Sequence, residues 1–482
     1  MLAVINVLGS MLMLFSVTYL LPIVTSVIYA DGLFVDFIYA ALGCLATGAA
    51  TFAATRRHKR ELRSRDGFLL VTLAWVFMSA IATVPLLIAM PGLSFTDAFF
   101  ETMSGLSTTG ATVLTGLDTM APSLNLWRHA LNWYGGMGII VLVVAILPML
   151  GVGGMQLYKA ETPGPVKDEK LTPRITQTAR ALWFVYLLIT VACIVSLKLA
   201  GMNWFDAVCH SFAALALGGF STYDASVGHF DSPAIEAVLI VFMLIAAMNF
   251  ARHFMAWQQK SLRTYATDIE AKAMLAIIGV STIGVALYIW LNGVYPSFLV
   301  ALRHTAFNLV SIATDCGFVS QDYAAWPMFA PMVILMLSCY CANTGSTGGG
   351  IKMFRTLVLF RQASRELFLL VHPQAVTPVK IGSQVVANKI VFAVLAFVVL
   401  YFGTVVTLTF MLLASGLDFI SSFSAIIACI NNAGPGLGVV GPSSNFQVLT
   451  DFQTWVCSLA MLLGRLEIFS MLVLFTPTFW RK

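Results

Sequence analysis

The chain has 482 residues, of which 59% are hydrophobic and only 10% carry a charged side chain. Soluble globular proteins have about 25% charged residues, so this composition cannot cover a water-facing surface and excludes a soluble enzyme. The formal net charge of +5 indicates little by itself. Long apolar runs, such as Met11 to Ala30 and Ile139 to Leu150, favour membrane-spanning helices over the short alternating segments of a β-barrel.

Polar breaks divide the apolar runs into ten predicted spans. They lie near residues 4–30, 33–55, 68–91, 126–158, 181–200, 233–257, 272–292, 326–344, 387–415 and 449–476. The first run lacks a basic leading region and a small-residue cleavage site, so we expect a retained span and not a signal peptide. The eight cysteines are scattered through apolar stretches without a CxxC pair, which is typical of small packed side chains.

Charge is distributed unevenly over this topology. Of the 27 lysines and arginines, 23 fall on one side of the predicted membrane. The positive-inside rule makes that side cytoplasmic and places both termini in the cytoplasm. Thirteen of the 22 acids fall on the outer side, where they should concentrate cations and repel anions.

Four outer segments share one pattern: 93–125, 201–232, 293–325 and 416–448. Each begins with a predicted helix that is too short to span the membrane, as in a re-entrant loop: Phe95 to Leu106, Trp204 to Leu215, Phe298 to Ile312 and Phe419 to Ile430. Each helix runs into a glycine turn, centred on Gly110, Gly219, Gly317 or Gly434. Asp97 and Asp206 stand 13 residues before their glycines, at plausible helix N-cap positions.

The chain crosses the membrane twice between successive glycine turns, so all four turns face the same side. We therefore predict an all-α polytopic membrane protein with ten transmembrane helices, in which two N-terminal helices precede four parallel repeats of span, pore helix and span around a pseudo-fourfold pore. The predicted units are residues 1–66 for the N-terminal pair and 67–160, 161–258, 259–386 and 387–482 for the repeats. Irregular backbone at membrane depth must line a wet cavity or be buried in protein.

A ring of such turns suits a cation. Backbone carbonyls can replace the hydration shell of the ion, and the four helices direct the negative ends of their dipoles toward the same place. Glycine allows the close approach and the positive φ that the turns need.

Several motifs together resemble the TrkH/TrkG branch of the Trk/Ktr/HKT superfamily of potassium transporters. They are SGLSTTGAT (104–112), LGGFST (217–222), ATDCGF (313–318), NNAGPG (431–436), ETPGPVKDEKLTPRI (161–175), GSTGGGIK (345–352) and GRLEIF (464–469). The resemblance implies potassium uptake through a filter formed by Thr108, Thr109, Gly110, Leu217, Gly218, Gly219, Asp315, Cys316, Gly317, Asn432, Ala433 and Gly434, with K⁺ as the bound and transported ion. Related plant proteins that prefer sodium have serine at the first glycine, so Gly110 favours potassium. A Na⁺- or H⁺-coupled symporter, or a weakly selective K⁺/Na⁺ transporter, remains an alternative.

Arg465 lies about midway along the last predicted span, where a charge is costly. It either pairs with a polar group on a neighbouring helix or, as the resemblance implies, projects into the pore as a barrier to cations. Glu467 is two residues away and does not face it on a helix. We expect Arg465 and Glu467 to be the only charges well inside the spans.

The glycine-rich stretch after the eighth span has two interpretations. Its residues Gly345, Ser346, Thr347, Gly348, Gly349 and Gly350 cannot hold a regular helix. They form either a cytoplasmic linker or, by resemblance, an intramembrane gating loop with Lys352 at its cytoplasmic end.

The sequence contains no HExxH motif or close histidine pair, and the GxGxxG pattern at 436–441 follows no strand, so no enzymatic centre is expected. The basic run Arg56 to Arg65 is interpreted as a contact to lipid headgroups and not as a nucleic-acid site. The resemblance implies the cytoplasmic (inner) membrane of a bacterium, a homodimer and a cytosolic nucleotide-binding RCK-type regulatory subunit (TrkA-like). Loops 159–180, 259–271 and 352–386 are the predicted docking sites for that subunit.

Overall fold

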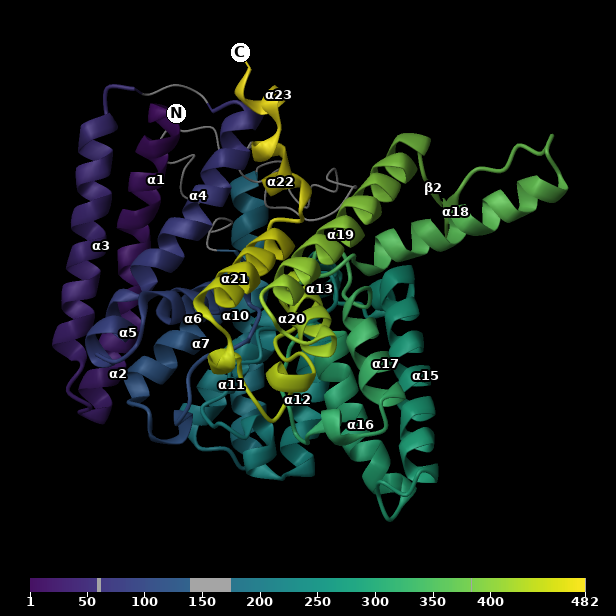
Figure 1. Ribbon diagram of the computed structural model, residues 1–482, viewed down its shortest axis with the longest axis horizontal. Coiled ribbons are helices and arrows are strands. Elements are labelled where there is room, and N and C mark those ends of the chain that lie inside the picture. The colour runs from purple at the N-terminus through teal and green to yellow at the C-terminus, as the bar shows by residue number, and fades with distance from the viewer. Residues whose placement is uncertain (59–61, 139–174, 383, 482) are drawn as a thin grey trace.

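A computed structural model of the chain describes residues 1–58, 62–138, 175–382 and 384–481 (Figure 1). The apolar run Ile139 to Leu150, most of the predicted span 126–158 and the greater part of the predicted docking loop 159–180 lie outside the described residues. The described part is a helical bundle whose N- and C-termini lie at the same end (Figure 1).

The N-terminal helices form a closely packed hairpin at one side of the bundle (Figure 1). It comprises α1 (Leu2–Phe15), α2 (Leu20–Tyr29) and α3 (Phe34–Thr55). Gly9 and Gly48 face each other, because a Cβ on either would lie within 3.0 Å of the opposite backbone. Asn6 donates from Nδ2 to the Phe52 carbonyl and to Thr55 Oγ1, both at 3.1 Å. Small residues thus allow the close contact, and a polar side chain fixes its register.

Six continuous or gently broken helices are long and apolar enough to span a membrane within the described ranges. They are Leu2–Tyr29, Phe34–Thr55, Arg65–Ala89, Ala179–Leu199, Ile269–Leu291 and Asn388–Ala414. They contain α4 (Ser64–Ala82), α5 (Val84–Ala89), α10 (Ile175–Leu199), α15 (Ile269–Leu291) and α19 (Asn388–Ala414) besides the N-terminal helices. This result supports a membrane protein with several spans and leaves the predicted total of ten as a proposal.

Three predicted spans are not single straight helices. The span 233–257 consists of α12 (Pro233–Ala246) and α13 (Phe250–Gln259), which meet at 93°. The span 449–476 consists of α21 (Asp451–Arg465) and a continuation, Phe469–Phe475 with α22 (Phe469–Leu472), which meet at 107°. The span 326–344 contains only α17 (Phe329–Ser338), whose ten residues extend about 15 Å. Hydropathy averages over such breaks, so the predicted ranges did not reveal them.

Four short helices end near the middle of the bundle. They are α6 (Phe95–Ser107), α11 (Trp204–Ala216), α16 (Phe298–Ala313) and α20 (Phe419–Asn431), each close to its predicted range. Their N-caps are Ser94, Asn203, Ser297 and Asp418, whose side chains accept an N–H from the first turn. Asp97 and Asp206 are therefore not N-caps as predicted. They stand three residues later, where an acid favours the positive end of the helix dipole.

The remaining elements connect these helices. They are α7 (Pro122–Gly136), α14 (Arg263–Ala266), α18 (Met353–Val371), α23 (Pro477–Trp480) and a two-stranded antiparallel hairpin of β1 (Lys380–Ile381) and β2 (Gln384–Val385). Helix α18 extends away from the bundle, and the chain then returns along it to this hairpin (Figure 1). The all-α prediction is therefore correct for the bundle but misses one short hairpin.

We predict that Gly48→Val destabilises the N-terminal hairpin. The added side chain overlaps the Gly9 carbonyl and Met13, and overpacking of this kind costs about 1–3 kcal/mol. Thermal unfolding in detergent should show a lower midpoint for this variant. Gly43→Val is the matched control, because a Cβ at Gly43 on the same helix meets nothing within 4 Å. Equal midpoints for the two variants would contradict the close contact.

Candidate filter and gate

Each short helix ends in the same backbone reversal. The residue that begins the reversal, Thr108, Leu217, Asp315 or Asn432, has a positive φ between 54° and 66°. The next N–H then bonds back to a helix carbonyl: Thr109 to Ser104 at 2.9 Å, Gly218 to Ala213 at 2.8 Å, Cys316 to Ser311 at 2.8 Å and Ala433 to Ala428 at 2.8 Å. This pattern ends a helix while satisfying its last backbone groups, and it sends the chain back toward the side from which the helix came.

The four predicted filter glycines follow these reversals and meet one another in a ring. All four have positive φ: Gly110 (80°), Gly219 (60°), Gly317 (93°) and Gly434 (85°). A Cβ on each would lie within 3.0 Å of the carbonyl oxygen of the next turn. Those carbonyls belong to Gly218, Cys316, Ala433 and Thr109, in that order, so the contacts close a circle. Segments more than 300 residues apart thus share one small volume.

A cavity of about 80 Å³ opens on this ring. Each of the four turns contributes to the lining of this cavity, through Gly110, Gly219, Gly317 and Pro435. The residues that follow the glycines form its wall, together with Arg128, Asp224 and Asn445. The four turns therefore converge on one space.

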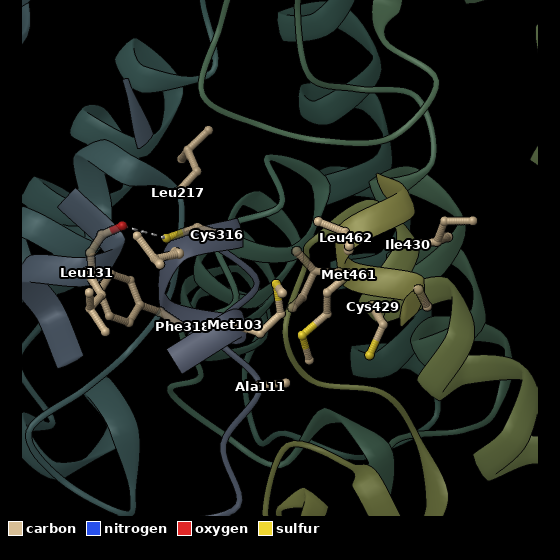
Figure 2. Packing of buried hydrophobic residues seen from close by; sticks show 14 of the residues in the cluster. Met103, Ala111, Leu131, Leu217, Cys316, Phe318, Cys429, Ile430, Met461 and Leu462 are labelled. Atoms are coloured by element: carbon tan, nitrogen blue, oxygen red, sulfur yellow. Dashed lines mark hydrogen bonds between the residues drawn. The ribbon is translucent and has the colours of Figure 1, made fainter. Parts of the chain in front are cut away.

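Side chains around the turns are directed into the protein. Figure 2 shows hydrophobic residues from several helices packed about the turns, among them Met103, Phe318 and Met461. The Cys316 thiol is fully buried and points toward the Ala213 carbonyl, 4.0 Å from Sγ (Figure 2). Asn432 donates from Nδ2 to Thr109 Oγ1 at 2.9 Å, which connects the last turn to the first. The side chains thus hold the turns from behind.

The glycine-rich stretch between α17 and α18 lies directly against three of the turns. Gly349 donates its N–H to Asp315 Oδ2 at 3.0 Å, and Thr347 donates from Oγ1 to the Leu215 carbonyl at 3.1 Å. A Cβ on Gly349 would overlap the Asn431 carbonyl. The stretch therefore packs against the ring and against the ends of the short helices.

The two ends of this stretch are also held. Asn343 donates its N–H to the Ala247 carbonyl at 3.1 Å, and Gly345 accepts from Phe250 N–H at 3.1 Å. Ser346 Oγ bonds to the Asn343 carbonyl at 2.7 Å, and a Cβ on Gly350 would overlap the Ser338 and Cys339 carbonyls. Lys352 is buried and donates from Nζ to the Gly348 carbonyl.

Arg465 is the last residue of α21, at the 107° bend. It donates from Nη1 to Thr108 Oγ1 at 3.1 Å and to the Thr347 carbonyl at 3.0 Å. From Nη2 it donates to the Gly135 and Gly136 carbonyls, the latter at 3.2 Å. The guanidinium thus connects the first turn, the glycine-rich stretch and α7 through neutral polar groups.

Arg465 and Glu467 are not the only buried charges of the bundle, since others lie at the end of a predicted span or outside the predicted spans. Glu101 and Arg128 form an ion pair whose side chains are 0% and 1% exposed. Arg355 pairs with Glu467 at 2.7 Å and stacks 4.0 Å above the Phe397 ring. These partners come from helices far apart in sequence, so spacing could not reveal them. The one available signal was Glu101 itself, an acid on an apolar helix nine residues before a filter glycine.

The comparisons with known proteins agree over the whole length. The family model described as "TrkH: Cation transport protein" matches residues 35–482. Trk system potassium uptake protein TrkH of Vibrio parahaemolyticus is 47% identical and TrkG of Escherichia coli K12 is 40% identical, with 100% and 98% of this chain and 99% and 97% of those proteins covered. The crystal structure of the potassium transporter TrkH from Vibrio parahaemolyticus superposes with a TM-score of 0.90 at 44% identity, covering 100% of this chain and 99% of that one.

We predict that Arg355→Met lowers the free energy of unfolding by about 2 kcal/mol. Breaking a fully buried ion pair costs about 3–5 kcal/mol. The cost is smaller here because the Glu467 side chain is 24% exposed. Unfolding of the detergent-solubilised protein, followed by intrinsic fluorescence, measures the change. Arg361→Met removes an exposed arginine from the same helix and should have almost no effect. Adding Glu467→Leu should recover part of the lost stability, and no recovery would count against the ion pair.

Proposed function

The chain belongs to the TrkH family of cation transport proteins, and on that premise we propose that it takes up potassium across the cytoplasmic (inner) membrane of a bacterium. Family membership confirms the resemblance drawn from the motifs and the interpretation as a transporter and not an enzyme. The relatives are named Trk system potassium uptake proteins, which supports potassium as the transported ion.

The observation that carries the proposal is the closed ring of four glycine turns. Its members are the filter residues: Thr108, Thr109 and Gly110; Leu217, Gly218 and Gly219; Asp315, Cys316 and Gly317; Asn432, Ala433 and Gly434. The N–H groups of the first two residues of each turn bond backward into the helix, and the Leu217 and Cys316 side chains pack into the hydrophobic core. Carbonyl oxygens are then the groups left to replace the water around a cation. Four repeats, at 67–160, 161–258, 259–386 and 387–482, each supply one quarter of the ring.

Each turn has only one glycine with positive φ beside a left-handed residue, and not a longer run of coordinating residues. We therefore propose few ordered ion sites and a modest preference for potassium over sodium. The negative ends of α6, α11, α16 and α20 point at the ring and favour a cation of either kind.

We further propose that Gly345 to Gly350 and Arg465 close the path beneath the filter. The stretch packs against three turns, and the guanidinium bonds to the first turn and to Thr347. A guanidinium held by neutral carbonyls keeps its charge and repels a cation in the low dielectric of the pore. Opening requires the loop to leave these contacts. A cytosolic nucleotide-binding RCK-type subunit, docked on the segments 259–271 and 352–386, supplies such a signal in this proposal, and a homodimer is its expected assembly.

Purified protein in liposomes tests the ion. We predict a K⁺ flux whose reversal potential, measured across opposing K⁺ and Na⁺ gradients, gives a permeability ratio above one in favour of potassium. Gly317→Ala should abolish the flux, since its Cβ overlaps the Ala433 carbonyl. Gly293→Ala has a similar positive φ but open space around it and serves as the control for backbone strain. A permeability ratio near one rejects potassium selectivity, and a flux driven only by a Na⁺ or proton gradient favours the symporter.

We predict that Arg465→Ala raises the K⁺ flux several-fold, because a barrier of about 1 kcal/mol corresponds to about fivefold in rate. The assay is tracer uptake into liposomes at equal protein content. Arg263→Ala removes the same charge from an exposed position and should leave the flux unchanged. Unchanged or lower flux in a folded Arg465→Ala protein contradicts the barrier.

A further inference from the structure

The ion pair of Glu101 on α6 and Arg128 on α7 lies behind the first filter turn. Arg128 Nε donates to Glu101 Oε1 at 2.8 Å, and the exposed fractions of the Arg128 and Glu101 side chains are 1% and 0%. Burying two charges costs several kcal/mol each unless the geometry and the remaining hydrogen bonds are good. A pair in this place therefore needs an account beyond stability.

Arg128 Nη1 donates to Asn125 Oδ1 on α7 at 3.1 Å, and the other hydrogen bonds of the pair go to the chain that leaves the filter. Thr112 Oγ1 donates to the Glu101 carboxylate at 2.9 Å and accepts from Arg128 Nη2 at 3.4 Å. Val113 N–H donates to Glu101 Oε2 at 3.1 Å. Thr112 and Val113 are the second and third residues after Gly110. The pair thus holds the outgoing arm of the first turn at three points.

Arg128 also reaches the outgoing arm of the second turn. Its Nη1 donates to the Ser221 carbonyl at 3.3 Å, and its guanidinium lies 4.4 Å from the centre of the Phe220 ring. These are the second and first residues after Gly219. The rigid, planar guanidinium therefore connects two adjacent quarters of the ring, and Arg128 itself lines the filter cavity.

The other turns are held from matching positions by neutral groups. His210, nine residues before Gly219, bonds from Nε2 to Ser221 Oγ at 3.0 Å. Asn308, nine residues before Gly317, accepts Ser320 N–H at 3.1 Å and donates to Ser320 Oγ at 3.1 Å. Ser424, ten residues before Gly434, accepts Leu437 N–H at 2.8 Å. Of these four contacts, all within the described ranges, only the first is ionic. His210 also reaches a second turn, through ring stacking on Phe318 at 5.6 Å, so the first contact is the one that joins two turns through a charged group.

We propose that Glu101 and Arg128 are positioning residues for ion discrimination: the pair fixes the outgoing arms of the first and second turns relative to each other and thereby the spacing of their carbonyls. The inference rests on the proposed function. Whether a filter selects by cavity size or by the number and field of its carbonyls, selection depends on where these arms are held. Because the two charges cancel, the pair sets geometry without adding net charge beside the cation.

Thr112→Val is the decisive variant. It keeps the shape of the side chain and the ion pair, but it removes the hydroxyl by which Thr112, in the outgoing arm of the first turn, bonds to the pair. We predict a fall of about fivefold in the K⁺/Na⁺ permeability ratio, equivalent to about 1 kcal/mol at 1.4 kcal/mol per tenfold. Thr112→Ser keeps the hydroxyl and should restore the wild-type ratio. The double variant Glu101→Gln/Arg128→Met leaves no unpaired buried charge and should lower the ratio at least as far.

Glu236→Gln is the matched control. It breaks another pair, with Arg303 at 2.7 Å, in which the acid is 4% and the arginine 28% exposed and neither partner bonds to a filter arm. Its permeability ratio should equal that of the wild type. A wild-type ratio in Thr112→Val and in the double variant, with transport retained, overturns the inference and leaves the proposed function intact. A wild-type protein without K⁺ flux or preference overturns the proposed function instead.

Discussion

The closed contact among four glycines is the constraint on which the rest of the proposed pore depends. At membrane depth the backbone has no water to bond, so each reversal must satisfy its own N–H groups, and it does so by bonding back into its helix. Each glycine then meets a carbonyl of the next turn at a distance that excludes a Cβ. Gly110 is necessary because of Gly218, and Gly434 because of Thr109. No turn can take this position until its neighbours are in place, so the site is a property of the whole chain.

The same constraint extends below the ring. Gly349 approaches the Asn431 carbonyl as closely as the filter glycines approach each other, and it bonds to Asp315 from the third turn. Arg465 reaches both the first turn and Thr347 only because α21 ends there and the chain bends by 107°. A straight helix through Arg465 would carry the chain past these groups. The bend therefore places the Arg465 guanidinium where the proposed gate needs a positive charge.

The sequence was sufficient to predict what depends on single residues and short spacings. Lengths of about 13 residues and a following glycine identified α6, α11, α16 and α20, and charge asymmetry gave a topology. Prediction failed where neighbours in space decide. The breaks in the spans at 233–257, 326–344 and 449–476 fall at residues that bond across the bundle, such as Asn343, and hydropathy does not register those bonds. The Glu101–Arg128 pair joins helices whose contact only the fold provides.

The fourfold pattern also explains why the glycines are the positions at which the four predicted repeats are most alike in sequence. The two residues before each glycine differ among the turns, while the first of each pair has the same left-handed backbone conformation. The pairs are Thr108 and Thr109, Leu217 and Gly218, Asp315 and Cys316, and Asn432 and Ala433. Carbonyl chemistry is common to all residues, so these side chains are free to vary as long as they pack behind the turn, as Cys316 does. The supports, which are the side chains nine or ten residues before each glycine that bond to the chain after it, vary for the same reason. They are an acid with its arginine, a histidine, an asparagine and a serine. The backbone ring is thus nearly symmetric while its supports are not, and differences in how firmly each quarter is held must come from the supports.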